Sequence, residues 1–137
     1  MAFSAGRTST VSIDDGTGTP RDLSAFVESA SVDLNGGVEE TTTMGATGDA
    51  RTYIRGLNGG SFSISGYYDP TATTGVDTVL ESLYDAVASA TWAISFDAGT
   101  TTYGGEAFMS SYSTSASVGG VVSFSADFTV TGVTTRT

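Results

Sequence analysis

Reactive side chains are scarce in this sequence, and this limits the chemistry that the chain can perform. The 137 residues contain no histidine, no cysteine and no lysine. Histidine is the commonest general base and the commonest neutral metal ligand, and cysteine is needed for disulfides and thiolate sites. Many serines are present, but the chain supplies no histidine or lysine to activate one of them. The sequence therefore predicts a protein that is not an enzyme and that has no cofactor.

Carboxylates are the remaining reactive groups, and two pairs are adjacent in the sequence, Asp14 with Asp15 and Glu39 with Glu40. Neighbouring strand residues point to opposite faces, so the two glutamates are not expected to share a substrate unless a bulge intervenes. A retaining glycosidase that uses two carboxylates is the one hydrolase still open. The stretch DDGTGT (14–19) lacks the ligand spacing of a calcium loop. We therefore interpret it as a turn and predict no metal site.

Tyr53 lies between Arg51 and Arg55, a combination that could contact nucleic acid. The chain has five arginines against fifteen acidic residues, which gives a formal net charge of −10. Such a charge opposes binding to phosphate or to anionic lipid. The better hypothesis is a contact between these arginines and carboxylates across a subunit boundary, with a plain surface loop as the alternative.

The composition predicts a single mainly β domain spanning residues 1–137. A chain of this length fits one domain with its own core. Charged residues make up only 15% of it, whereas serine and threonine together number 42, a mixture that suits strands with small hydroxylated outer faces. No signal segment or membrane span is visible, so we expect a soluble cytoplasmic product without membrane contact. Composition alone fits any soluble β-sandwich equally well.

Short segments of alternating apolar and polar residues are typical of a β-sandwich or barrel. In VVSFSADFTV (121–130), Phe124 and Phe128 fall on one side of a strand, and Ser125 and Asp127 fall on the other. Similar strands are predicted at 9–13, 22–27, 29–34, 38–43, 61–68, 91–99 and 101–116, with tight turns at NGG (35–37) and SVGG (117–120).

One helix is predicted at about residues 75–89. Val76, Leu80, Leu83 and Val87 recur at helical spacing and form a single apolar stripe. The stripe predicts a helix that lies against one flank of the sheet.

A long loop is predicted at about residues 44–58, because MGATGDARTYIRGLNGG (44–60) has neither helical nor strand periodicity. Loops this long inside a compact domain are usually functional or disordered. Large apolar side chains, which a disordered linker does not need, favour contact with a neighbouring subunit or ring. Covering the protein's own core is the alternative. The candidate contact residues are Met44, Arg51, Tyr53, Ile54, Arg55 and Leu57.

Three segments, in order, resemble the major tail proteins, or tail tube proteins, of long-tailed bacteriophages. DLSAFVESASVDLNGGVEETTTMG (22–45) is similar to the early strands of that family and its ETTT-hydrophobe-G stretch. RTYIRGLNGGSFSISGYYDP (51–70) is similar to its TYI-x-GL segment, and GGEAFMSSYSTSASVGGVVSFSADFTVTG (104–132) to its closing hairpin. The order and spacing of the segments, which cover residues 9–132, make the resemblance fairly specific.

The resemblance implies a β-sandwich or barrel-like tail-tube fold with one flanking helix, in subunits that form hexameric rings stacked into a hollow tube. It places the protein in the virion tail, assembled in the host cytoplasm around a tape-measure protein. It also implies contacts with tail-terminator and baseplate proteins, and DNA that passes through the lumen without specific binding. The tubes of contractile tails and type VI secretion systems are related. Relatives commonly carry lysine in the loop, so its absence here leaves open which loop charges pair.

A tube that conducts DNA needs a wall to which phosphate does not adhere, because a duplex carries one negative charge per roughly 1.7 Å of its axis. Small hydroxyls and scattered carboxylates meet this need, and six copies at −10 sum to about −60. These strands could equally face the outside of the tube. The candidate lumen residues are Ser61, Ser63, Ser65, Ser111, Ser113, Ser123, Ser125 and Asp127.

Two other functions stay open at this point. One is a tail-end ring protein, such as a terminator or baseplate component, which has the same fold but does not polymerise. The other is a monomeric β-sandwich binding module, which would need an aromatic platform outside the core. Tyr53, Tyr67, Tyr103 and Tyr112 could contribute to such a platform.

Overall fold

Seven strands and one α-helix make up the regular structure of the computed structural model, which describes residues 5–45 and 48–137. The strands are β1 (Thr10–Asp14), β2 (Pro20–Asp22), β3 (Val27–Glu40), β4 (Tyr53–Tyr67), β5 (Ala90–Ser95), β6 (Thr102–Ser115) and β7 (Ser123–Arg136). A short 3-10 helix, η1 (Gly6–Thr8), precedes them, and α1 (Val76–Tyr84) lies between β4 and β5. The predicted mainly β fold with one flanking helix is confirmed.

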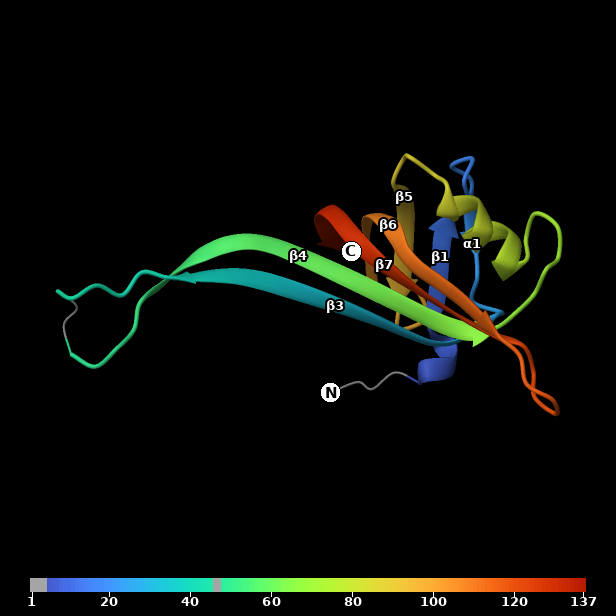
Figure 1. Cartoon of the computed structure of the whole chain (residues 1–137), viewed down its shortest axis with the longest axis horizontal. Coiled ribbons are helices and arrows are strands. Elements are labelled where there is room, and N and C mark those ends of the chain that lie inside the picture. The colour runs from blue at the N-terminus through green and yellow to red at the C-terminus, as the bar shows by residue number, and fades with distance from the viewer. Residues whose placement is uncertain (1–4, 46–47) are drawn as a thin grey trace.

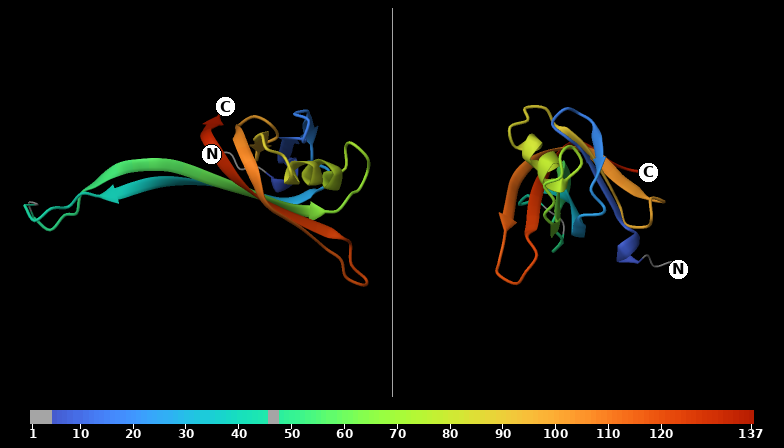
Figure 2. Two further views of the ribbon diagram at one scale, coloured as in Figure 1. Left: turned by 45° about the horizontal axis from the view of Figure 1, so that its top comes forward. Right: turned by 90° about the vertical axis from the view of Figure 1, so that its right-hand side faces the viewer.

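All seven strands belong to one antiparallel sheet in the order β2-β1-β5-β6-β7-β4-β3. The sheet curls strongly, and β3 and β4 extend together far beyond the body of the molecule (Figures 1 and 2). A groove lined by Ser9 and Val11 on one side and by Val27 and Ala30 on the other lies between the two ends of the curled sheet. The sheet is therefore barrel-like without being closed.

The core lies inside the curl of the sheet and is centred on three aromatic rings. The ring of Phe62 stacks on Trp92 and on Phe128, with centroid distances of 4.5 Å to each. Most residues predicted to point inward from 61–68 and 121–130 are buried here, including Ile64 and Phe124, whereas Val122, which precedes β7, is 38% exposed. Period-2 alternation thus assigned the faces of these strands correctly.

The helix α1 covers one side of this core and is shorter than predicted, because it ends at Tyr84 instead of residue 89. Its residues Val76, Val79, Leu80 and Leu83 are buried, whereas Tyr84 is 76% exposed. A helix gains most of its stability from burying an apolar face, and the stripe has nothing to pack against beyond Leu83. Within the described ranges, no helix has the length and apolar character needed to cross a membrane.

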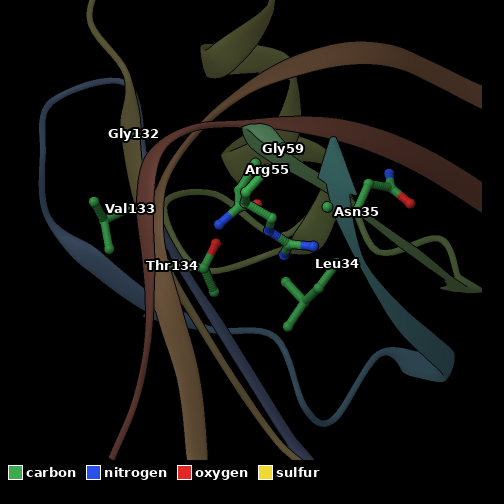
Figure 3. A pocket seen from close by; sticks show the side chains of 9 residues that line it. Leu34, Asn35, Arg55, Gly59, Gly132, Val133 and Thr134 are labelled. Carbon is green, nitrogen blue, oxygen red and sulfur yellow. The ribbon is translucent and has the colours of Figure 1, made fainter. Parts of the chain in front are cut away.

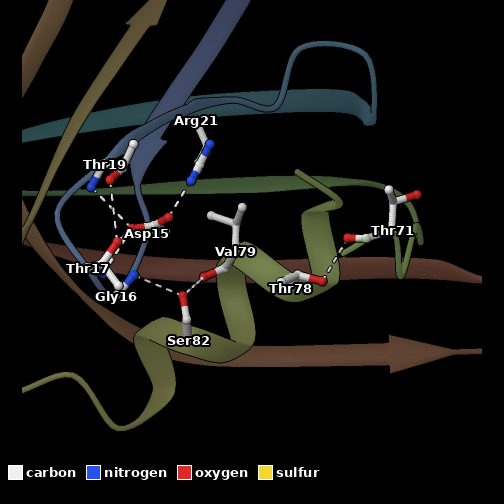
Figure 4. Close-up of polar contacts among 9 residues, drawn as sticks. All are labelled: Asp15, Gly16, Thr17, Thr19, Arg21, Thr71, Thr78, Val79 and Ser82. Carbon is white, nitrogen blue, oxygen red and sulfur yellow. Dashed lines mark hydrogen bonds and ion pairs between the residues drawn. The ribbon is translucent and has the colours of Figure 1, made fainter. Parts of the chain in front are cut away.

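Polar contacts fix the helix against the neighbouring segments (Figure 4). The hydroxyl of Ser82 accepts a hydrogen bond from the backbone N–H of Gly16 at 2.9 Å, and Thr78 donates to the carbonyl of Thr71 at 2.9 Å. At the other side of the helix, Asp77 accepts hydrogen bonds from Tyr112 at 2.7 Å and from Tyr68 at 3.2 Å. These contacts hold α1 in one orientation on the sheet.

The predicted loop at 44–58 is wrong in extent, and the tight turn predicted at 35–37 does not form. Residues 53–58 are strand, part of β4, and Gly36 and Gly37 lie inside β3, so the connection between the two strands spans only residues 41–52. A register shift between Gly36 and Val38 places an extra residue on β4. Glycines and this bulge removed the alternation by which a strand is recognised. A second register shift lies between Gly104 and Glu106 in the pairing of β6 with β7.

Candidate functional site

The strands β6, β7, β4 and β3 turn small hydroxyl side chains away from the core. Ser125 of β7 lies opposite Ser113 of β6 and Ser65 of β4, and Ser65 lies opposite Ser29 of β3. One row of serines therefore crosses all four strands. We call this surface the hydroxyl face, and it comprises Ser29, Ser31, Asp33, Ser61, Ser63, Ser65, Ser111, Ser113, Ser115, Ser123, Ser125, Asp127 and Thr129.

The side chains of the hydroxyl face are hydrogen-bonded in pairs across the strands. The Oγ–Oγ distances are 2.6 Å for Ser29–Ser65, 2.8 Å for Ser31–Ser63, 2.7 Å for Ser113–Ser125 and 2.9 Å for Ser115–Ser123. Ser111 donates to Oδ2 of Asp127 at 3.0 Å. All of these residues are exposed or half-buried. The result is a largely polar surface, flanked by the exposed rings of Tyr67 and Phe108, on which each serine pair uses one of its two O–H donors internally.

The charge on this surface is negative. The hydroxyl face contains the carboxylates Asp33 and Asp127 and no arginine. A shallow hollow at its edge is lined by Glu28 together with Ser65, Ser113 and Ser123. A phosphate group that approaches the face would therefore meet carboxylates and hydroxyls without a cation.

All eight residues predicted for the lumen lie on the hydroxyl face, on three adjacent strands. Their role in a lumen stays a prediction. Sequence analysis did not include Ser29, Ser31, Asp33, Ser115 or Thr129, although alternation in SASVDL (29–34) already separates Ser31 and Asp33 from the apolar residues. The missing information was the strand pairing, which places β3 beside β4.

The second feature is the arm, which we define as residues 34–60, the projecting part of β3 and β4 with their connection (Figure 1). Six large apolar side chains of the arm are more than half exposed: Leu34, Val38, Met44, Tyr53, Ile54 and Leu57. Soluble monomers rarely expose so many apolar side chains in one segment. Exposed apolar surface of this kind is typical of a region that contacts another molecule.

Four of these exposed residues, Met44, Tyr53, Ile54 and Leu57, are predicted contact residues, and the structure places them all on the arm. Leu34 and Val38 were not among the predicted contact residues. Alternation in 29–34 places Leu34 on the core side of its strand. That side is correct, but the body does not extend far enough to cover it, and Leu34 is 56% exposed.

The predicted arginines of the arm have different surroundings. Arg51 Nε lies 4.0 Å from a carboxylate oxygen of Glu40, and both side chains are largely exposed, so this ion pair contributes little stability. The guanidinium of Arg55 lies against the backbone of Gly36, in a groove at the base of the arm. Neither arginine points to the hydroxyl face.

The other candidate sites have structural explanations. Asp15 accepts hydrogen bonds from Thr17 and Thr19 and an ion pair from Arg21 at 3.0 Å, so DDGTGT forms a turn as predicted (Figure 4). The hydrogen bond from the Thr17 side chain is the main reason why the pKa of Asp15 lies far below its usual range. Glu39 and Glu40 occupy successive positions in the β3–β4 ladder and so point to opposite faces. Within residues 5–45 and 48–137, no cluster of three or more acidic side chains could hold a metal ion.

An aromatic platform is not formed by the four candidate tyrosines. The hydroxyl of Tyr112 points into the body, where it binds Asp77, and Tyr103 packs against the core. Tyr53 lies on the arm and Tyr67 at the other end of β4. The binding-module hypothesis thus loses the sequence feature on which it depended.

Comparison with known proteins bears on both surfaces. The family model for "Phage tail tube protein" matches residues 4–136. No curated protein matches the sequence.

Several solved structures share the fold. A chain from the tail of an empty gene transfer agent (GTA) particle, refined with C6 symmetry, is 17% identical with a TM-score of 0.82, over 98% of this chain and 99% of the other. A chain of the SPP1 tail tube is 15% identical with a TM-score of 0.73, over 98% of this chain and 78% of the other. A chain of the anti-feeding prophage baseplate is 12% identical with a TM-score of 0.70, over 100% and 97%.

Proposed function

The chain belongs to the phage tail tube protein family, and we propose that it forms hexameric rings that stack into a tube with the hydroxyl face toward the lumen. A tail tube protein is a structural component of the virion tail. The observation that carries the proposal is the continuous row of paired hydroxyls across β6, β7, β4 and β3. The C6 symmetry reported for the GTA tail, whose chain has the same fold, supports the ring size.

The chemistry of the hydroxyl face supports its place in the lumen. DNA is a polyanion, and a wall that bound its phosphates would slow its passage. Asp33 and Asp127 repel phosphate, and the serine pairs use part of their hydrogen-bonding capacity internally. DNA would therefore slide along this wall without being held. The same wall would enclose a tape-measure protein during assembly.

The free edges of the sheet support ring formation. In the strand order, β2 and β3 are the terminal strands, so within the described chain each has one edge without a partner strand. Exposed edges invite pairing with other chains unless they are used or protected. A head-to-tail ring that joins the β3 side of one copy to the next copy uses these edges and closes after six subunits.

The arm supports contact along the tube axis. It extends beyond the body, so it can reach a neighbouring subunit or the next ring (Figure 1). Its apolar side chains, above all Leu57 at 94% exposure, require a partner to be removed from water. Contacts of this heterologous kind repeat without limit along an axis, as a long tube requires.

A tail-end ring is the second candidate function, because the anti-feeding prophage baseplate chain has the same fold. Such a ring would be hexameric but would not stack on itself. Either form would meet terminator, baseplate or tape-measure proteins at the ends of the tube.

Electron microscopy of the purified protein at rising concentration tests the proposal directly. Long hollow tubes are the expected result, single rings would favour the tail-end alternative, and monomers at every concentration would contradict both.

The orientation of the hydroxyl face is tested by labelling, because the chain has no cysteine of its own. A Ser125→Cys variant should react with a polymer-linked maleimide as a free subunit and be protected in intact tubes. Val87→Cys, at a position 94% exposed beyond the end of α1, is the matched control and should react in both states. Equal labelling of the Ser125→Cys variant before and after assembly would place the hydroxyl face outside.

A further inference from the structure

A groove at the base of the arm holds an arginine whose surroundings are unusual in this chain. Arg55 lies on β4 opposite Val38, just beyond the bulge at Gly36. The groove has a volume of about 510 Å³ and lies between β3, β4 and the end of β7. Figure 3 shows the guanidinium of Arg55 between Leu34, Asn35 and Thr134.

Within residues 5–45 and 48–137, the guanidinium of Arg55 has no acidic partner. Among the described residues, only Arg21 and Arg51 have a carboxylate within 4.0 Å. This is notable in a protein with fifteen acidic residues and five arginines. Two other polar side chains of the groove, those of Asn58 and Thr134, can donate hydrogen bonds. The groove thus presents one fixed positive charge and neutral donors.

Gly36 provides the space that the guanidinium occupies. A Cβ atom on Gly36 would lie 2.6 Å from Cζ and from Nη1 of Arg55, much closer than real contacts allow. The backbone of Gly36 is not in the left-handed region, so its conformation does not require glycine. Glycine at residue 36 is therefore explained by the space that the guanidinium of Arg55 occupies there.

We propose that this groove is the receptor for a side-chain carboxylate of a second copy of the chain, bound by the guanidinium of Arg55. The proposal rests on the proposed self-assembly and adds the contact that orients the arm. An arginine fork binds a carboxylate through two parallel hydrogen bonds, and the amide of Asn58 adds a further donor. The side chain of Leu34 lies beside the guanidinium and flanks the groove (Figure 3).

A second copy is the occupant that charge complementarity favours. The arm and the body lie at opposite ends of the molecule, and head-to-tail assembly joins different surfaces of the two copies (Figure 1). The body carries exposed carboxylates that have no hydrogen bond or ion pair with described residues, namely Glu28, Glu81 and Asp85. Each copy therefore offers both the cation and the anion of the contact.

Two single substitutions test the contact in opposite ways. Arg55→Gln removes the charge but keeps a hydrogen-bonding side chain. Gly36→Ala keeps the charge but displaces the guanidinium of Arg55 from its position beside residue 36. This substitution should lower the free energy of unfolding only slightly, because the displaced group is the end of a flexible side chain. The controls are Arg7→Gln, which makes the same change in net charge outside the groove, and Gly6→Ala, which also lies outside the groove and whose added Cβ meets no atom within 4 Å.

The measurement is the critical concentration for tube formation by the purified full-length protein, with urea denaturation of the free subunit to verify folding. We expect Arg55→Gln and Gly36→Ala each to raise the critical concentration about tenfold or more. The double variant should be no worse than the more severe single variant, because both changes remove one contact. The two controls should assemble like the wild type.

The proposal is overturned if either Arg55→Gln or Gly36→Ala assembles at the wild-type concentration, or if their effects add in the double variant. These outcomes are distinct from failure of the proposed function, in which the wild-type protein itself would form neither rings nor tubes.

Discussion

Replacing Ile54 and Leu57 by aspartate should block stacking while leaving the fold intact. Ile54 is 59% exposed and Leu57 is 94% exposed in the isolated chain. Their side chains therefore contribute little to folding, and surface changes of this kind usually alter the free energy of unfolding by less than about 0.5 kcal/mol. If the arm packs against a second copy, both side chains leave water on assembly.

The magnitude follows from the exposed fractions. Fully burying a leucine or isoleucine side chain contributes about 1.5–3 kcal/mol, so these two exposed fractions together correspond to roughly 2–5 kcal/mol per arm. Since about 1.4 kcal/mol is a factor of ten in an equilibrium constant, the critical concentration should rise at least about 30-fold. Burying two unpaired carboxylates would raise it further.

The assay is sedimentation of assembled protein over a concentration series, with urea denaturation of the unassembled subunit beside it. Val87→Asp is the matched control, because Val87 is also 94% exposed but lies outside the arm. The control should assemble normally. Normal tubes from the Ile54→Asp, Leu57→Asp double variant, at the wild-type concentration, would refute the assignment of the arm to an interface.

Three further predictions concern the core, the pH range and the hydroxyl face. Phe62→Ala removes the ring that stacks on Trp92 and Phe128, so the free energy of unfolding measured in urea should fall by about 3–5 kcal/mol; a loss below about 1 kcal/mol would contradict the packing. Burial, with the nearby Asp77, raises the pKa of Tyr112 above its ordinary value of 10.0. The contribution of Tyr112 to the free energy of unfolding is therefore complete below pH 10.0 and is lost at higher pH, because the tyrosine of the unfolded state ionises first. Denaturation against pH should show this alkaline loss, and Tyr112→Phe should reduce it, whereas an unchanged loss would assign it to another group. Ser125→Arg should make assembled tubes retain added DNA in a pelleting assay, and equal retention by wild-type and variant tubes would argue against a lumenal position.

The faces of the strands were predictable from the sequence, but their partners were not. Period-2 alternation placed Phe124 and Phe128 in the core and Ser125 and Asp127 outside, and the structure agrees. Alternation is a local property that each strand carries in its own residues. The row that joins Ser125 to Ser65 depends on the order β6-β7-β4-β3, which brings together residues 60 positions apart. No single segment contains that information.

The arm was predicted as a contact region but not as a pair of strands, for a physical reason. Its strands pair through glycines and a bulge, and neither provides the alternating side chains by which strands are recognised. The helix shows the opposite error, since its apolar stripe continues in sequence to Val87 while α1 ends at Tyr84. Helical periodicity predicts a face, but the extent of a helix depends on what that face can pack against.

The core and the proposed interface are parts of one surface. On β3, Ala30 and Val32 are half-buried against the body, while Leu34 and Val38, at the following alternate positions, are more than half exposed. The strands β3 and β4 have 14 and 15 residues, longer than most strands of globular proteins. The body covers only the first part of β3 and the last part of β4, so the same alternation that specifies folding at one end of the pair leaves an apolar surface for association at the other. Assembly would then extend the hydrophobic core into the next subunit, and a net charge of −10 helps to keep the free subunit soluble until that partner is reached.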